Sequence, residues 1–206
     1  MKINYADKLI DLIYDYKYGI ETCREQEFDR RMINFGYKPT PYRNLRKIFR
    51  KYKFTENNHL IDYGCGKGRV LFMAALNGCK KATGIEINSD MYDIAIDNVK
   101  SFNDKHKIMD NRIQIINADA MKYQLENSAD TFFFFNPFHM KVFIYVLNII
   151  KNSVISYPRS VKIFLINPKE SVIWTIERMQ FFTSKEESKT DNYSIYFYDA
   201  RTDFHA

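Results

Sequence analysis

The most constraining feature of the chain is a glycine-rich turn between an apolar run and a helical pattern. Residues 60–70 read LIDYGCGKGRV, with Gly64, Gly66 and Gly68 at alternate positions. Glu86 stands at the end of the next apolar run, eighteen residues after Gly68. In α/β sheets, such glycines let the backbone approach a nucleotide or nucleoside, and the carboxylate after the second strand accepts hydrogen bonds from ribose hydroxyls. The pattern therefore predicts a nucleoside-binding α/β sheet.

The spacing of these glycines distinguishes between classes of ligand. A dinucleotide fingerprint, G-x-G-x-x-G, would have its third glycine at position 69, where this chain has Arg69. A P-loop would close with Gly-Lys-Ser or Gly-Lys-Thr, which the turn lacks. The spacing excludes both motifs. A tight turn without a ligand is the alternative, and the position between a strand and a helix argues against it.

Length and composition indicate one soluble domain with an N-terminal extension. The chain has 206 residues, of which 46% are hydrophobic and 16% aromatic. Such a chain can bury a full core and is too apolar for disorder. We expect a helical extension with a covering loop over residues 1–58 and the nucleoside-binding domain over residues 59–206.

Sequence features that the chain lacks predict where the protein is located. The apolar runs are too short to span a membrane, and the start, MKINYAD, lacks the apolar core of a signal peptide. Cys23, Cys65 and Cys79 are an odd, scattered set, typical of reduced thiols, and the four histidines form no pair with metal-ligand spacing. We therefore expect a cytoplasmic protein with no metal and no membrane partner, as a monomer or homodimer.

The order of apolar runs and turn residues predicts alternating strands and helices after one or two helices in residues 3–28 and a proline-containing loop over 35–42. The expected strands are 59–63, 82–87, 112–117, 131–135 and 161–166, with a closing hairpin of 181–184 and 194–198. The expected helices are 69–77, 90–102, 140–152 and 170–178. This alternation is typical of a three-layer, doubly wound α/β fold. We expect a mostly parallel seven-stranded sheet with an antiparallel last strand, preceded by N-terminal helices.

A basic helix is expected over residues 43–53. Residues 1–58 hold 13 Lys and Arg against 8 Asp and Glu. Leu45, Ile48, Phe49 and Tyr52 have helical spacing, so the cations between them form an outer face. This face could contact nucleic-acid phosphates. A solvated helix face that covers one edge of the sheet is the favoured interpretation.

Residues 40–200 resemble the class I S-adenosylmethionine-dependent methyltransferases, which have a seven-stranded Rossmann-like fold, and in particular small uncharacterised bacterial-type members. The resemblance implies that the cofactor is S-adenosyl-L-methionine. Asp62 and Gly64, with the following Gly66 and Gly68, would lie near its amino-acid end. In Gly-Ile-Glu-Ile-Asn, Glu86 would accept both ribose hydroxyls and Ile87 would pack on the adenine.

A third motif of this family is similar to Ile-Asn-Ala-Asp-Ala at residues 116–120. The resemblance places Asp119 close to the adenine amino group, with the adjacent backbone at Ala118 also contacting the base. An N-cap role for Asp119 at the start of a helix is the alternative. The two roles can coexist.

A fourth motif follows four consecutive phenylalanines, 132–135, which predict a strand buried on both faces. Asn136, Pro137 and Phe138 come next and are similar to the Asn/Asp-Pro-Pro-Tyr/Phe motif of methyltransferases that act on nitrogen. In that motif the Asn and a backbone carbonyl accept hydrogen bonds from the target amine. Here the second proline is replaced by Phe138, and His139 stands where the aromatic would be. The alternative is a strand-ending turn with Phe138 in the core.

The loop before the basic helix, Tyr-Lys-Pro-Thr-Pro-Tyr at residues 37–42, resembles the loop that covers the cofactor in seven-stranded protein-lysine methyltransferases. The resemblance implies that Thr40 and Tyr42 line the cofactor or acceptor channel. Tyr42 could instead be the first apolar contact of the basic helix.

Together the motifs predict a methyltransferase directed at nitrogen. Methyl transfer to nitrogen needs alignment and hydrogen-bond acceptors, whereas oxygen acceptors need a base or a metal. His139 is the one histidine placed to act as such a base, and a structural role is favoured for it. The acceptor remains open among a protein amine, RNA and a small molecule. A catalytically silent S-adenosylmethionine-binding protein is the alternative function.

Overall fold

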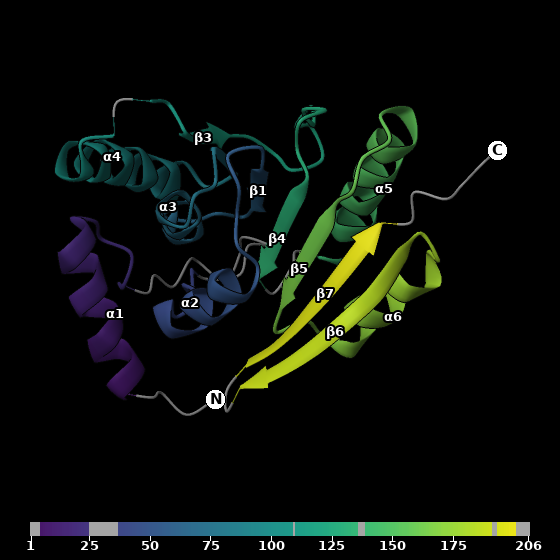
Figure 1. Cartoon of the computed structure of the whole chain (residues 1–206), viewed down its shortest axis with the longest axis horizontal. Helices are drawn as coiled ribbons and strands as arrows, with labels where there is room; N and C mark the ends of the chain where they lie inside the picture. Colours follow the sequence, from purple (N-terminus) through teal and green to yellow (C-terminus); the bar gives the residue numbers. More distant parts are fainter. Residues whose placement is uncertain (1–4, 25–36, 109, 136–138, 191–192, 201–206) are drawn as a thin grey trace.

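The computed structural model of the chain describes residues 5–24, 37–108, 110–135, 139–190 and 193–200. Its strands form one seven-stranded sheet in the order β3-β2-β1-β4-β5-β7-β6 (Figure 1). The strands are β1 His59–Tyr63, β2 Lys81–Glu86, β3 Ile113–Asn117, β4 Thr131–Phe135, β5 Lys162–Ile166, β6 Phe182–Thr190 and β7 Tyr193–Ala200. The first five strands are parallel, and β7 runs antiparallel to both of its neighbours. The predicted fold class is confirmed.

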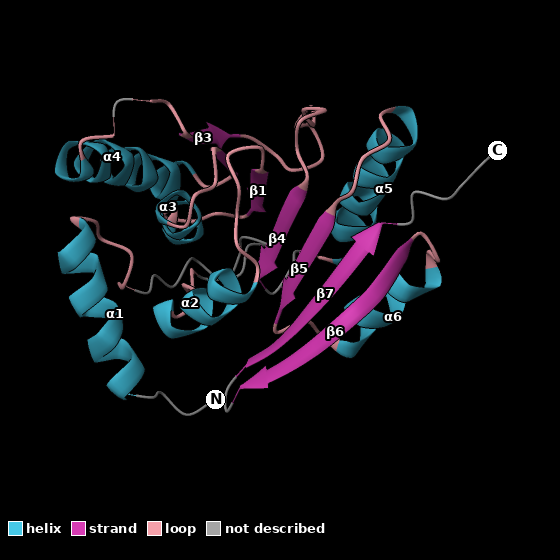
Figure 2. Ribbon diagram, viewed as in Figure 1, coloured by secondary structure: helices cyan, strands magenta, loops and turns pink. Residues whose placement is uncertain are grey.

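The helices cover both faces of this sheet. They are α1 Tyr5–Tyr18, α2 Tyr42–Lys51, α3 Arg69–Leu76, α4 Ser89–His106, α5 Met140–Ser156 and α6 Glu170–Arg178. The buried side chains of α2, α3 and α4 belong to one hydrophobic cluster, whereas those of α5 and α6 belong to a second. Figure 2 shows α5 and α6 next to each other along β5–β7, with α1 to α4 at the other end of the view.

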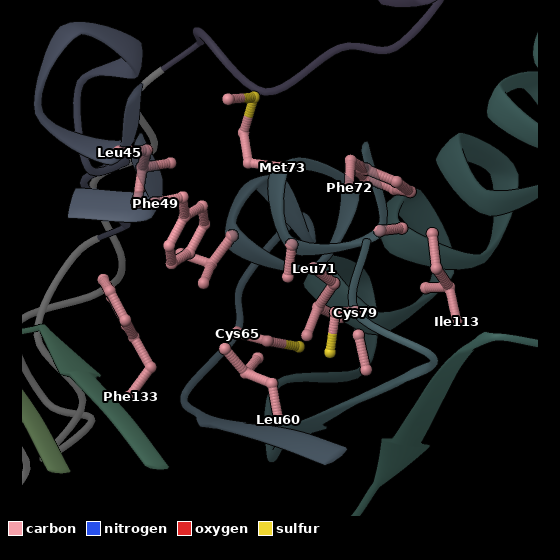
Figure 3. Close-up of a cluster of buried hydrophobic side chains, with 14 of the residues drawn as sticks. Leu45, Phe49, Leu60, Cys65, Leu71, Phe72, Met73, Cys79, Ile113 and Phe133 are labelled. Carbon is pink, nitrogen blue, oxygen red and sulfur yellow. The ribbon is translucent and has the colours of Figure 1, made fainter. Parts of the chain in front are cut away.

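Strand β4 joins the two clusters because its phenylalanines alternate between them. Phe132 and Phe134 pack with Phe143 of α5, while Phe133 belongs to the cluster of α2 and α3. Figure 3 shows side chains of α2, α3 and β4 in the cluster that contains Phe133. All three phenylalanines are fully buried. The prediction of a strand buried on both faces is confirmed, and it places the end of β4 at the middle of the sheet's carboxyl edge.

The N-terminal helices share a core with the sheet. Tyr18 of α1, together with Tyr42 and Phe49 of α2, lies in the same hydrophobic cluster as Leu60 of β1. The helix predicted within residues 3–28 is α1, and residues 25–36 lie outside the described part of the chain. The division at residue 58 stays a prediction.

Two segments show the largest differences from the sequence-based expectation. Strand β6 is longer than predicted, with a bulge between Ser184 and Glu186. Its polar sequence, FTSKEESKT, has no apolar alternation, and it forms a strand because β7 pairs with it along its length. Residues 118–130 form a turn-containing loop, so the alternative in which Asp119 caps a following helix is wrong. Within the described residues, no helix is both long and apolar enough to cross a membrane.

Candidate nucleoside site at the glycine turn

The glycine turn lies at the carboxyl edge of the sheet between β1 and α3. Gly64, Gly66 and Gly68 have φ values of 78°, 52° and 88°, a region that other residues rarely adopt. The N–H of Gly64 donates to the carbonyl of Ile85 across 2.8 Å, so the turn is tied to the end of β2. This backbone explains the alternate glycines and brings the turn beside the residue that follows Ile85.

Gly84 in β2 is a further requirement of the turn that the sequence pattern did not reveal. A Cβ atom at this position would lie 2.5 Å from Sγ of Cys65 and 2.7 Å from Cδ1 of Leu71. Since real Cβ atoms do not approach so closely, only glycine lets the turn and α3 pack on β2. The glycine inside an apolar run was the sequence feature that could have predicted this close packing.

Glu86 ends β2 with its carboxylate held against the turn. The side chain is only 8% exposed. Its Oε2 accepts the N–H of Gly66 at 2.8 Å, and its Oε1 accepts the N–H of Asn88 at 2.9 Å. The carboxylate oxygens have about four lone-pair sites in total, so acceptor capacity remains for a further donor. Burial raises the pKa of Glu86, an effect that the backbone N–H groups of Asn88, Gly66 and Ile87 oppose.

Asp62 of β1 is a second buried carboxyl close to Glu86. Burial raises its pKa well above the ordinary value, and the charge of Glu86 raises it further. Two buried carboxylates in electrostatic contact disfavour simultaneous ionisation. A cationic ligand group near Asp62 would offset this repulsion.

The ends of β2 and β3 supply an apolar surface next to Glu86. Ile87 is 54% exposed and offers a flat aliphatic contact. The N–H of Ala118 donates to the carbonyl of Glu86 across 3.0 Å. Oδ1 of Asp119 accepts the N–H of Met121 at 2.9 Å, so this side chain stabilises a turn. The adenine role of Asp119 stays a prediction, compatible with that turn.

Arg69 follows the turn and makes a buried polar network that sequence reasoning missed. Its guanidinium is 2% exposed, and Nη1 lies 2.5 Å from Oδ2 of Asp11 in α1. Nη1 also donates to the carbonyl of Thr40 at 3.1 Å, and Nε donates to Oγ1 of Thr22 at 2.7 Å. Asp15 lies 3.9 Å from Nη2. One side chain thus holds α1 and the covering loop against the glycine turn.

Lys67 and Tyr37 make further contacts between the glycine turn and the N-terminal segment. The side chain of Lys67 is fully buried, and its Nζ donates to Oε2 of Glu21 at 2.7 Å and to the carbonyl of Arg24 at 3.0 Å. The Tyr37 ring lies directly over Gly66, because a Cβ atom there would be 2.4 Å from its Cε2. The Tyr37 hydroxyl donates to the carbonyl of Thr22 at 2.9 Å. The N-terminal segment therefore covers the turn.

Thr40 and Tyr42 are both buried beside this network. The Tyr42 hydroxyl donates to Oδ1 of Asp15 at 2.7 Å, and its ring centroid lies 4.3 Å from Cζ of Arg69. The placement of Tyr42 matches the alternative in which it makes the first contact of the basic helix. The proposed contacts of Thr40 and Tyr42 with the cofactor stay predictions.

The candidate acceptor residues Asn136, Pro137 and Phe138 lie outside the described residues. Strand β4 ends at Phe135, and α5 begins at Met140. His139 is exposed and caps α5, with Nδ1 accepting the N–H of Lys141 at 3.5 Å. The cap is a structural role, as favoured from the sequence.

Several cations of α2 have partners within the chain. Arg43 lies 3.8 Å from Asp7, Arg46 contacts the hydroxyl of Tyr14, and Lys51 pairs with Glu186. The basic face therefore contributes to the attachment of α2 to α1 and β6. Its contact with nucleic acid stays a prediction. In the part of the chain that the structure describes, no group of His, Cys, Asp and Glu side chains is arranged to hold a metal ion.

Comparison with known proteins identifies the segment that carries this site. Residues 60–148 match the family model of a methyltransferase domain. This range begins in β1 and includes the glycine turn, Glu86 and the end of β4.

Curated relatives match a shorter stretch. A protein-lysine N-methyltransferase from Saccharolobus islandicus is 35% identical over 65 residues, which are 31% of this chain and 40% of that protein. A protein from Methanocaldococcus jannaschii that is described as uncharacterised is 40% identical over 47 residues, which are 22% of its length. The chain thus spans less than half of the curated relatives that it matches.

Solved structures match over most of the chain. An RNA methyltransferase from Salinibacter ruber, in complex with S-adenosyl-L-homocysteine, has a TM-score of 0.60 at 16% identity. The match covers 79% of this chain and 94% of that one. An N-methyltransferase from Bradyrhizobium japonicum has a TM-score of 0.56 at 12% identity, over 77% of this chain and 93% of that one. At such identities these likenesses show the fold.

Proposed function

We propose that the chain, whose residues 60–148 match a methyltransferase domain, is an active class I S-adenosylmethionine-dependent methyltransferase directed at a nitrogen. The observation that carries this proposal is the position of Glu86. Its buried carboxylate is held against Gly66 by a backbone hydrogen bond and keeps acceptor capacity for a ligand. This arrangement matches a vicinal diol, such as the ribose hydroxyls of S-adenosyl-L-methionine.

The described residues fit this cofactor at both ends. Glu86 would accept the ribose hydroxyls, and the exposed Ile87 would pack on the adenine. Asp62 would lie near the amino-acid end, where a positive ammonium offsets the repulsion between the two carboxyls. When bound, S-adenosyl-L-methionine supplies a methyl group on a positively charged sulfur, which is a good leaving group.

The chain's own contribution would be alignment and exclusion of water. The N-terminal segment is attached to the glycine turn through Arg69, Lys67 and Tyr37. A segment held in this way restricts access of water to the turn, and Asn136 would orient the acceptor. A nitrogen acceptor needs little more than this, since its lone pair is the nucleophile once the amine is neutral.

A protein amine is the first acceptor to test. The curated relative from Saccharolobus islandicus is named a protein-lysine N-methyltransferase. The loop at residues 37–42 also resembles the corresponding loop of such enzymes. RNA and small molecules are the remaining acceptor classes.

Two measurements test the proposal. Isothermal titration with S-adenosyl-L-homocysteine should show binding by the wild type and weaker binding by Glu86→Gln. Incubation with tritiated S-adenosyl-L-methionine and a fractionated cell extract should then label protein above RNA and small molecules. Binding without transfer to any fraction would support the silent cofactor-binding alternative. Label in RNA or metabolites would identify a different class of acceptor and would still support methyltransferase activity.

A further inference from the structure

Helix α1 carries an apolar stripe on its outer face. Leu9, Leu12, Ile13 and Tyr16 are 61%, 51%, 56% and 85% exposed. Their spacing of i, i+3, i+4 and i+7 places them along one side of the helix. Figure 1 shows α1 at the left margin of the molecule, below α4 and outside α2. A contiguous exposed stripe of this kind is typical of an interaction surface, unlike single exposed apolar residues.

The side chains on the opposite face of α1 contact other parts of the chain. Asp11, Asp15 and Tyr18 are buried, and the two carboxylates contact Arg69. The rings of Tyr14 and Tyr18 pack on Tyr42 of α2. Attachment of α1 to the domain therefore does not require the outer stripe, whose side chains are free to contact another molecule.

Cations border the stripe on both sides. At about 100° per residue, Lys8 and Lys17 lie about 90° to either side of its centre, and both are exposed. Lys105 of α4 donates to the carbonyl of Tyr16 at 2.8 Å, with Nζ 5.4 Å from the Tyr16 ring centroid. The three acids of α1 are all engaged, since Asp7 lies 3.8 Å from Arg43 and the other two contact Arg69. The border of the stripe is thus positive.

We propose that the outer face of α1 binds an amphipathic helix of a partner protein whose apolar seam is flanked by acidic residues. The stripe has the width and spacing of a helix–helix seam, in which Leu9 and Tyr16 are one heptad apart. Acidic residues on the partner would pair with Lys8 and Lys17. This surface is additional to the proposed methyl-transfer site.

Charge argues against a second copy of the chain as the occupant. Lys8 and Lys17 make both borders of the stripe positive, so a second copy of α1 packed on it would bring cationic borders together and offer no acidic partner for either lysine. Like charges across a helix seam disfavour association. An anionic membrane would also complement the cations, but helices that lie on membranes present a broader apolar face than this four-residue stripe.

Peptide selection on the intact protein tests the proposal. The library contains helical peptides of about 18 residues, with a fixed leucine seam and flanking positions varied among Glu, Gln, Ser and Lys. Selection on the immobilised wild-type chain should enrich Glu at the flanks. A selected peptide is then labelled, and its affinity is measured by fluorescence anisotropy. It should bind the wild type with at least about tenfold higher affinity than the Leu12→Gln/Ile13→Gln variant.

A matched control separates the stripe from general exposed apolar surface. Ile155 of α5 is 55% exposed, against 56% for Ile13, so Ile155→Gln should bind the peptide as wild type does. Tyr16→Ser serves as the second test if the double variant does not fold. Selection without Glu enrichment, or equal binding to wild type and stripe variants, would overturn the proposal. So would stripe-dependent dimers in sedimentation velocity, or stripe-dependent binding to phosphatidylserine vesicles.

Discussion

The N–H of Gly66 donates a 2.8 Å hydrogen bond to Oε2 of Glu86, which fixes the acidic end of β2 against the centre of the glycine turn. The two residues are twenty positions apart in the chain and adjacent at the sheet edge. This contact orients the carboxylate before any ligand arrives. Preorganisation of that kind lowers the cost of binding, because the side chain has little rotamer freedom left to lose.

Replacement of Glu86 should weaken the cofactor site strongly. Glu86→Ala removes a charged acceptor of two hydroxyls, so we expect a loss of about 2–3 kcal/mol in S-adenosyl-L-homocysteine binding, measured by titration calorimetry. The ligand-free protein should also lose stability, since the buried N–H of Gly66 loses its acceptor. Glu86→Gln, which keeps one acceptor oxygen, should preserve more of the stability. Glu56→Ala, at an exposed loop position, is the control. Normal cofactor binding by Glu86→Ala would refute the ribose assignment.

Cofactor binding should release protons through Asp62. Its pKa is raised by burial and by Glu86, so the ligand-free fold favours the protonated carboxyl and loses that contribution as pH rises through the raised pKa. A cationic ligand group favours the ionised form. Affinity should therefore increase with pH across this raised pKa, and calorimetry in buffers of different ionisation enthalpy should detect proton release. Asp62→Asn should abolish the release. An unchanged proton count in Asp62→Asn would contradict this role.

The sequence predicted the central strands well because their ends are chemically distinct. β1 and β4 begin and end at the expected residues, since polar or turn-forming residues bound each apolar run. The same reasoning could not find the full length of β6. That strand has a polar sequence and an edge position, so its pairing with β7 decides its structure.

The buried network at Arg69 was beyond local sequence patterns. Its partners Asp11 and Thr22 lie 58 and 47 positions away, and no motif links them. Asp11 and Asp15 stand one helical turn apart among apolar residues, which was the available signal. A buried pair of acids on an otherwise aromatic helix face requires a cation from elsewhere, and only the tertiary structure shows which one.

Asn136 remains the predicted acceptor-orienting residue, at a position outside the described residues. If it accepts a hydrogen bond from the target amine, Asn136→Ala should lower turnover by about 100-fold and leave cofactor affinity near wild type. Single-turnover transfer and calorimetric titration measure the two quantities. A turn-forming role predicts instead a lower melting temperature, with activity loss that follows the unfolded fraction. A well-folded Asn136→Ala protein with full turnover would remove this residue from the site.

His59 should make the protein sensitive to mild acid. Burial, with the nearby Lys81, lowers the pKa of His59 to about 4, and its ring nitrogens contact Ser128 and Thr83. Because the fold favours neutral imidazole, its contribution is present above the ordinary pKa of 6.5 and is lost as pH falls from 6.5 toward 4. Urea unfolding at several pH values should show this loss, and His59→Gln should flatten it. The exposed His139→Gln should keep the wild-type slope. A wild-type slope in His59→Gln would assign the acid sensitivity to other groups.

Arg69 should be energetically coupled to Asp11 across the boundary between α3 and α1. Arg69→Met leaves the buried Asp11 and Asp15 without their cation, so we expect a loss of about 3–5 kcal/mol in unfolding free energy, measured with urea. Adding Asp11→Asn removes one of the stranded charges. The double variant should therefore be more stable than the sum of the single losses predicts, with a coupling of about 1–3 kcal/mol.

The exposed pair of Arg43 and Asp7, at 3.8 Å, provides the matched comparison for this cycle. Its coupling should stay below about 1 kcal/mol, because solvent screens exposed charges. If the losses from Arg69→Met and Asp11→Asn are additive, the salt bridge does not hold α1 to the glycine turn. If instead the two losses couple as expected, a further result should follow. Added S-adenosyl-L-homocysteine should raise the unfolding free energy of Arg69→Met by less than it raises that of the wild type. The reason is that the covering segment in this variant is detached from the glycine turn that it stabilises.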